Sequence, residues 1–198
     1  MNELLTRLGV PPALQAWFDC EKETVFDYGG AKEIFAAGFH KVPTTVNLWL
    51  GGNRSASEVV ITHSVMEAIA FLTLHAGHYP RRDTLSFIAT GNLPGMAQLQ
   101  WIRQNFKKRK FTLVFGNDLL GALTDIKVAA GLKGQDTRLL LTGDDVRIQM
   151  KTQMRILSVP QVSLYAFEKA FGLRMGIRTR KPPVASTFLD QLKYGQSA

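Results

Sequence analysis

Residues that could take part in chemistry follow three predicted strands. The first strand is followed by His63, the second by Gly91 and Asn92, and the third by Asp118. An imidazole can transfer protons near neutral pH, and a carboxylate is a ligand type that Mg²⁺ uses. The backbone N–H groups of a glycine-containing turn before a helix can bind phosphate, although the same turn is explained by the flexibility that its glycine provides. The ends of these strands are therefore the first candidates for a site.

A regular alternation of strands and helices positions these residues. Apolar and β-branched runs predict strands at residues 58–62, 84–89, 111–115 and 137–142. Apolar residues at helical spacing predict helices at residues 64–76, 95–106 and 119–130. This order favours right-handed crossovers, and ligands of such sheets bind beyond the carboxyl ends of the strands. The expected fold is α/β, with a Rossmann-like, mostly parallel four-stranded sheet and helices on both faces.

Changes of pattern divide the chain into three parts. Residues 1–56 form an aromatic-rich lead-in that ends at a glycine-containing turn, and we expect it to pack on the core. Residues 57–145 contain the alternating strands and helices. Residues 146–198 form a basic α+β extension, with a predicted strand pair, a helix, a strand rich in arginine and a terminal helix.

The net charge of +8 is unevenly distributed. Residues 1–100 carry a net charge of −2, and residues 101–198 carry +10. Such a concentration of positive charge indicates a polyanionic partner, most simply nucleic acid, although basic clusters are also common as solvated faces. The expected phosphate contacts come from two clusters: Arg103, Lys107, Lys108 and Arg109, and Arg178, Arg180 and Lys181.

Composition excludes several classes of protein. The hydrophobic content of 45% and the absence of low-complexity runs argue against disorder. Apolar stretches such as residues 68–74 are shorter than the roughly 20 residues of a membrane span. The first ten residues lack the pattern of a secretory signal, and the single Cys20 cannot form an internal disulfide. A cytoplasmic protein with no membrane partner is expected.

The residues at the strand ends resemble the Toprim family, the catalytic domain shared by topoisomerases and bacterial-type primases. The matching stretches are residues 59–69, 86–91 and 113–121, and the resemblance covers about residues 57–142. The chain is most similar to the accessory primase-like proteins of mobile elements. In the family, a strand-end Glu acts as a general acid or base, and an Asp-x-Asp pair binds Mg²⁺ for phosphoryl transfer.

The chain departs from this family pattern at two positions. The resemblance places His63 where the family has its Glu and Gly116 where it has the first Asp, so that Asp118 alone remains of the pair. Glu67 matches an acidic residue on the first helix. The resemblance therefore implies catalytic positions at His63, Glu67 and Asp118, with Asp118 as the candidate Mg²⁺ ligand. Mg²⁺ requires several oxygen ligands, and imidazole suits transition metals better.

We therefore expect a catalytically degenerate Toprim-like protein that serves as a nucleic-acid-associated module in DNA replication or mobilisation. DNA is favoured over RNA as the partner, and no cofactor is expected unless Mg²⁺ binds at Asp118. One alternative is a Mg²⁺-dependent nuclease or nucleotidyl transferase with an altered site. Another is a scaffold for a partner protein, in which the positive charge is incidental.

Overall fold

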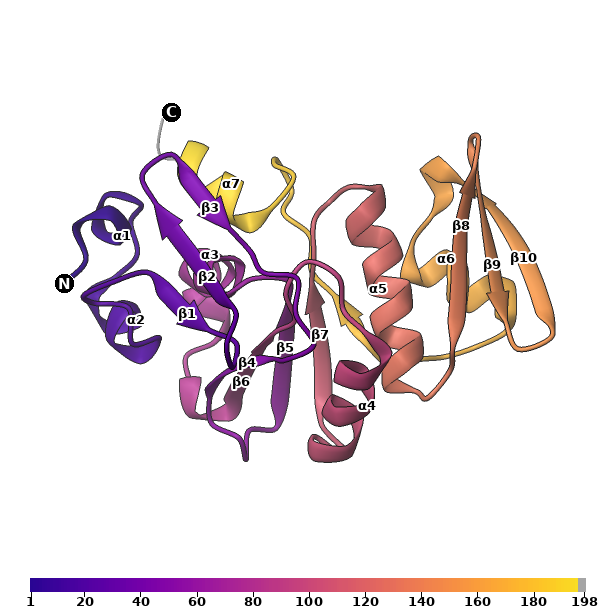
Figure 1. Cartoon of the computed structure of the whole chain (residues 1–198), viewed down its shortest axis with the longest axis horizontal. Helices are drawn as coiled ribbons and strands as arrows, with labels where there is room; N and C mark the ends of the chain where they lie inside the picture. Colours follow the sequence, from indigo (N-terminus) through magenta and orange to yellow (C-terminus); the bar gives the residue numbers. More distant parts are fainter. Residues whose placement is uncertain (196–198) are drawn as a thin grey trace.

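A five-stranded sheet forms the centre of the computed structural model, which describes residues 1–195 (Figure 1). Its strands, in order across the sheet, are β11 (Arg178–Thr179), β7 (Lys110–Val114), β5 (Glu58–Thr62), β6 (Leu85–Ala89) and β4 (Trp49–Gly52). The first four run parallel to one another, and β4 pairs with β6 in the antiparallel direction. The carboxyl ends of β5, β6 and β7 consequently lie side by side.

Helices cover both faces of this sheet because its middle strands are apolar on both sides. Val60 of β5 packs with α3 (Val65–Leu74) and α7 (Phe188–Tyr194). Its neighbours Val59 and Ile61 point to the opposite face, where they pack with α4 (Met96–Asn105) and α5 (Leu119–Leu132). The sheet therefore separates the chain into an α3 side and an α4 side.

Two small antiparallel sheets lie at opposite ends of the molecule (Figure 1). One contains β1 (Val25–Asp27), β2 (Lys32–Ala36) and β3 (Phe39–Lys41). The other contains β8 (Thr137–Thr142), β9 (Asp145–Met150) and β10 (Gln153–Ser158), with α6 (Leu164–Phe171) beside it. Three short 3₁₀ helices complete the connections: η1 (Ala76–His78), η2 (Arg82–Thr84) and η3 (Val159–Gln161).

The predicted fold, a single mostly parallel four-stranded sheet, is wrong. Residues 1–195 contain eleven strands in three separate sheets, of which two are antiparallel and one is mixed. The strand at residues 137–142 was expected to extend the parallel sheet, but it forms a hairpin with β9. The segment Trp49–Gly52, which was expected to belong to the aromatic-rich lead-in, instead adds an antiparallel edge to the central sheet.

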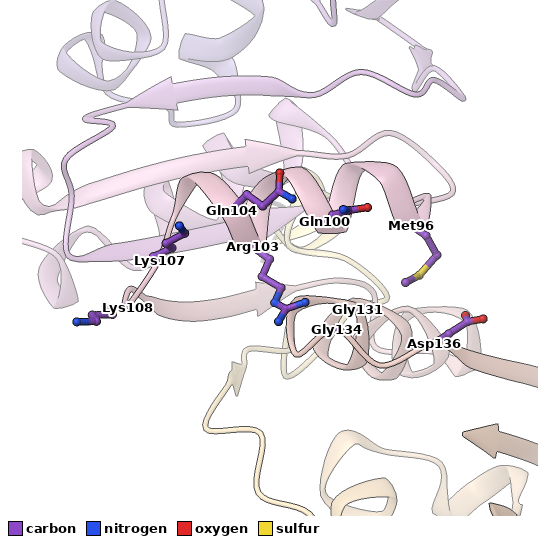
Figure 2. A pocket seen from close by; sticks show the side chains of 9 residues that line it. All are labelled: Met96, Gln100, Arg103, Gln104, Lys107, Lys108, Gly131, Gly134 and Asp136. Atoms are coloured by element: carbon purple, nitrogen blue, oxygen red, sulfur yellow. The ribbon is translucent and has the colours of Figure 1, made fainter. Parts of the chain in front are cut away.

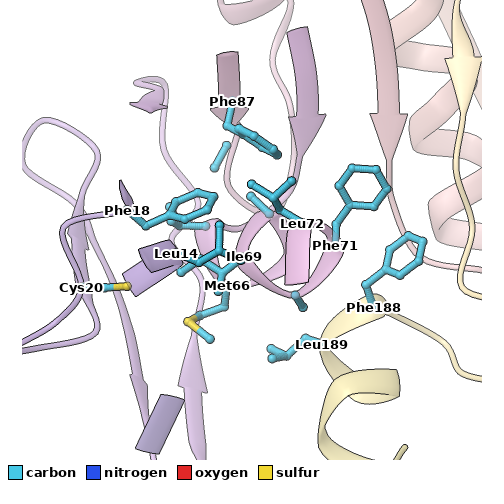
Figure 3. Close-up of a cluster of buried hydrophobic side chains, with 14 of the residues drawn as sticks. Leu14, Phe18, Cys20, Met66, Ile69, Phe71, Leu72, Phe87, Phe188 and Leu189 are labelled. Atoms are coloured by element: carbon cyan, nitrogen blue, oxygen red, sulfur yellow. The ribbon is translucent and has the colours of Figure 1, made fainter. Parts of the chain in front are cut away.

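The first two helices and the last helix, α7, pack on the α3 side of the central sheet. Apolar residues between α1 (Glu3–Arg7) and α2 (Pro12–Trp17), within α2 and just after α2 pack against α3 in one cluster. The same cluster contains Phe188 and Leu189 of α7 (Figure 3). Lys193 of α7 lies over the ring of Phe35 in β2, 5.5 Å from its centroid. Within residues 1–195, no helix is both long enough and apolar enough to cross a membrane.

Candidate functional site

The carboxyl ends of the parallel strands surround a small cavity of about 210 Å³. His63 from the end of β5, Asn92 from the loop after β6, and Gly116 and Asp118 from the loop after β7 all line it, together with Thr187 before α7. The structure thus brings His63 and Asp118 together, as the order of the strands predicts. It does not bring Glu67 into this cavity lining.

Asp118 caps the helix that follows it. Its Oδ1 accepts a hydrogen bond from the backbone N–H of Gly121 at 2.7 Å, which satisfies one of the free donors at the start of α5. Gly121 is required because a Cβ there would lie 1.9 Å from the carbonyl oxygen of Gly116. The Asp and Gly spacing that resembles the Toprim pattern therefore has a local structural explanation in this chain.

Glu67 caps a different helix. It is fully buried in α3, and its two carboxylate oxygens accept hydrogen bonds from the backbone N–H groups of Phe188 at 2.7 Å and Leu189 at 3.0 Å. Burial raises the pKa of Glu67 from its ordinary value near 4.5 to about 7, and the two N–H donors oppose this shift. Both oxygens are thus engaged in joining α3 to α7.

The raised pKa predicts a dependence of stability on pH. Between its ordinary pKa and about 7, Glu67 keeps a proton in the folded chain that it releases in the unfolded chain, so the free energy of unfolding should fall as pH rises through this window. The contribution is on the order of 3 kcal/mol, because one pKa unit corresponds to about 1.4 kcal/mol. Urea unfolding of Glu67→Gln at about pH 5 and about pH 8 should show a smaller fall than the parent chain.

Asp125 adds to the fall in the free energy of unfolding with rising pH, because burial raises its pKa to about 6 against the opposing effect of Lys181. The control is Glu3→Gln, at an exposed side chain, and it should retain the full dependence of stability on pH. An unchanged fall in Glu67→Gln would show that Glu67 is ionised throughout this pH range.

His63 is partly buried at the cavity wall. Burial lowers its pKa below the ordinary value of 6.5, although the nearby carboxylates of Glu33, Asp118 and Asp190 favour the charged form. The neutral imidazole is therefore the main form at neutral pH. Such a ring can accept or donate a proton. Of the other two predicted catalytic residues, Asp118 lines the cavity with it, as the cap of α5, and Glu67 does not.

The N-termini of three helices near these strand ends are each satisfied by a carboxylate of the chain itself. Asp118 caps α5 and Glu67 caps α7, while Glu33 of β2 accepts hydrogen bonds from the first N–H groups of α3, those of Val65 and Met66. These are the donors that would otherwise bind a phosphate. Glu33 was not among the predicted site residues, because it lies 32 positions before its partner and nothing local in the sequence signals the contact.

The same arrangement bears on the Mg²⁺ that the Toprim resemblance implies. Glu67 and Asp118 use their oxygens on backbone donors of different helices, and no group of three His, Cys, Asp or Glu side chains within residues 1–195 is placed to hold an ion. The residues at the strand ends therefore do not fit a Mg²⁺ ion that needs several free oxygen ligands.

The turn at Gly91 and Asn92, the candidate phosphate loop, binds another part of the chain. The backbone N–H of Asn92 donates to the carbonyl of Pro43 at 3.0 Å, and its side-chain amide donates to the carbonyl of Val42 at 2.8 Å. Gly91 has a φ of +77°, and a Cβ there would lie 2.5 Å from the same Pro43 oxygen. The glycine is thus needed for the close approach of residues 42–43, which accept hydrogen bonds from the backbone N–H and the side-chain amide of Asn92.

The first basic cluster lines a groove between two helices. Arg103, Lys107 and Lys108 border a cavity of about 690 Å³ between α4 and the end of α5 (Figure 2). We name it the α4–α5 groove; its other lining residues are Met96, Gln100, Gln104, Gly131, Gly134 and Asp136. A Cβ on Gly134 would lie 2.2 Å from the guanidinium of Arg103, so the glycine leaves room for that side chain. Arg109 is exposed in the following turn but is not part of the lining.

The second basic cluster lies elsewhere. Arg178 and Arg180 are exposed at the β11 edge of the central sheet, where they lie near Tyr79, a residue that packs on the α3 side. Burial raises the pKa of Tyr79, and the charges of these two arginines oppose the shift. The central sheet therefore separates the two arginines from the α4–α5 groove.

Lys181 is tied into the fold. Its ammonium lies 2.7 Å from Asp125 of α5 and donates to the carbonyl of Gly116 at 2.8 Å. Asp125 is buried, and its other oxygen has no hydrogen-bond partner within residues 1–195. Lys181 therefore neutralises a buried carboxylate, which the positions of the two residues, 56 apart in the chain, did not predict.

No family model, curated protein or solved structure matches this chain.

Proposed function

We propose that this chain is a nucleic-acid-associated module that binds phosphate groups at the α4–α5 groove. The observation that carries this proposal is the placement of Arg103, Lys107 and Lys108 around one cavity of about 690 Å³ (Figure 2). This volume exceeds that of the strand-end cavity, about 210 Å³. Guanidinium and ammonium groups bind phosphate oxygens irrespective of base sequence, and such contacts provide most of the non-specific affinity for nucleic acids.

The lining of the groove suits a sugar–phosphate backbone. Gln100 and Gln104 add amide groups that can bond phosphate or sugar oxygens, and both are exposed on α4 beside Arg103. Lys107 and Lys108 lie at one end of the groove, and Asp136 lies at the other (Figure 2). The positive potential is consequently concentrated at the end where α4 gives way to β7.

The proposal does not use the strand-end cavity for phosphoryl transfer. The carboxylates nearest to it cap helices, and the turn at Gly91 and Asn92 binds residues 42–43. A degenerate Toprim-like role in replication or mobilisation remains part of the proposal, but it rests on the resemblance at residues 57–142 alone.

A binding titration tests the proposal. The full chain should bind single- or double-stranded DNA at low ionic strength, and the logarithm of the affinity should fall linearly with the logarithm of salt concentration, because bound cations are released from the phosphates. Fluorescence anisotropy with labelled oligonucleotides at about 50 and about 200 mM salt measures both quantities. A chain that binds neither form of DNA nor RNA at the lower salt concentration would refute the proposal.

A further inference from the structure

The strand β8, which contacts α5, forms one edge of the small sheet at one end of the molecule (Figure 1). It is six residues long, contains three consecutive leucines, and pairs with β9 along one side only. No other strand among residues 1–195 pairs with its second side. Monomeric proteins usually shield such edges with prolines, bulges or several charges, and β8 carries only Arg138.

Two leucines of this strand are unusually exposed. Leu140 has 60% of its surface exposed and Leu141 has 53%. Leu140 pairs with the exposed Arg147 of β9, so it lies on the outer face of the sheet, whereas Leu141 pairs with the buried Val146 and lies on the inner face at the open edge. Each face of the edge therefore exposes one leucine.

We propose that β8 pairs with β8 of a second copy of this chain, in the antiparallel direction, to form a continuous six-stranded sheet. A two-fold axis perpendicular to the sheet keeps the outer faces of both copies on the same side of the combined sheet. Each residue of β8 must therefore lie opposite a partner residue that belongs to the same face. Centring the axis on Leu140 places Leu140 opposite Leu140 of the partner subunit. It also places Leu139 opposite Leu141 of the partner subunit.

The hairpin geometry supports this register. Thr142 and Asp145 flank a two-residue turn and form the hydrogen-bonded pair that closes the hairpin. Along the two strands, hydrogen-bonded pairs then alternate with non-hydrogen-bonded pairs. The N–H and C=O groups of Leu139 and Leu141 consequently point away from β9, toward the open edge. These groups would bond to one another across the axis, while Leu140 occupies the closer, non-hydrogen-bonded position.

Charge complementarity also favours this register. Arg138 lies opposite Thr142 of the partner subunit, and the next residue on the same face is Asp145 of the partner subunit, since Thr142 pairs with Asp145 within one chain. Strands lie about 4.8 Å apart, so a guanidinium can reach across one strand to this carboxylate. An axis at Arg138 would instead bring two arginines together.

The opposite edge of the small sheet is less suited to such pairing. Arg155 lies near the middle of β10, where its Nε donates to the carbonyl of Ala170 at 2.9 Å and its guanidinium lies over the ring of Phe171. That edge is therefore packed with the end of α6. β10 nevertheless carries Ile156, which is 54% exposed on the outer face, and this residue provides a matched control for Leu140.

Cysteine cross-linking tests the register directly. Non-hydrogen-bonded antiparallel neighbours have Cα atoms about 4.5 Å apart, within the range that a disulfide bridges, so Leu140→Cys should form a covalent dimer under mild oxidation. Ile156→Cys should not, because the two copies of this position lie roughly 24 Å apart across five strand spacings. The native Cys20 is buried and can remain in both variants. Equal cross-linking of the two variants would overturn the proposal.

Light scattering and sedimentation without nucleic acid give a second readout, which is independent of the proposed function. The parent chain and Ile156→Lys should dimerise with rising concentration, whereas Leu140→Lys should remain monomeric with an unchanged circular dichroism spectrum. Arg138→Asp and Asp145→Arg should each weaken the dimer, and their combination should restore it. A parent chain that is monomeric at all concentrations would refute the proposal, and the β8 edge would then be available only for a strand of another protein.

Discussion

Glu33→Ala is expected to destabilise the chain by about 3–5 kcal/mol, a large part of the stability of an ordinary domain. The carboxylate of Glu33 is fully buried and accepts hydrogen bonds from Val65 N–H at 2.7 Å and Met66 N–H at 3.0 Å. It also accepts one from the hydroxyl of Tyr28 at 2.7 Å and lies 3.0 Å from His40 Nε2. Alanine would leave these donors buried without an acceptor, at a cost of about 1–3 kcal/mol each before relaxation.

The control for this variant is Glu3→Ala. Glu3 is exposed and its ion pair with Arg7 spans 3.7 Å, so its removal should change the free energy of unfolding by less than about 0.5 kcal/mol. Urea unfolding followed by circular dichroism measures both. Glu33→Gln should fall between the two, because its amide oxygen accepts but its NH₂ group faces further donors. A Glu33→Ala chain as stable as Glu3→Ala would contradict this account of the cap.

Glu33 also shows why part of the fold could not be predicted from the sequence. The helix predicted at residues 64–76 is confirmed as α3, and its cap Ser64 accepts a hydrogen bond from the N–H of Glu67 at 3.0 Å. Local spacing is enough for such an element. The second cap of the same helix comes from β2, and the sequence contains no local signal for a contact between a strand of the lead-in and this helix.

The error in the predicted sheet has a physical origin at two segments. Trp49–Gly52 ends in two glycines, which in the sequence favour the end of an element. In the structure Gly52 instead allows a close approach to the neighbouring strand β6: it adopts a φ of +78°, and a Cβ there would lie 2.7 Å from the carbonyl oxygen of Leu85. The strand at residues 137–142 has the composition of a buried parallel strand. Gly143, with a φ of +60°, and Asp144 instead turn the chain directly into β9, a hairpin signal that outweighs composition.

The candidate site was predicted in part. The order of strands correctly placed His63 and Asp118 in one cavity lining. The roles of Glu67 and Lys181 depend on α7 and α5, which reach them from far along the sequence. A carboxylate at a helix start and a lysine in a basic run look the same in sequence whether they face a ligand or another element. Tertiary packing alone distinguishes these roles.

Removing the charges of the α4–α5 groove is expected to weaken nucleic-acid binding about 100-fold at low salt, if each of three phosphate contacts contributes roughly 1 kcal/mol. The variant combines Arg103→Gln, Lys107→Gln and Lys108→Gln, whose side chains are exposed, so the fold should be retained. The slope of log affinity against log salt should become shallower by about 2–3, close to one for each lost contact.

The matched control removes positive charge from the other surface. Arg178→Gln with Arg180→Gln alters the β11 edge on the far side of the central sheet, and it should change the affinity less than about threefold with a nearly unchanged salt slope. Lys181 is kept in both variants because its ammonium neutralises the buried Asp125. If the β11 pair weakened binding more than the groove triple, the phosphate contacts would lie on the α3 side, and the groove would not be the binding site.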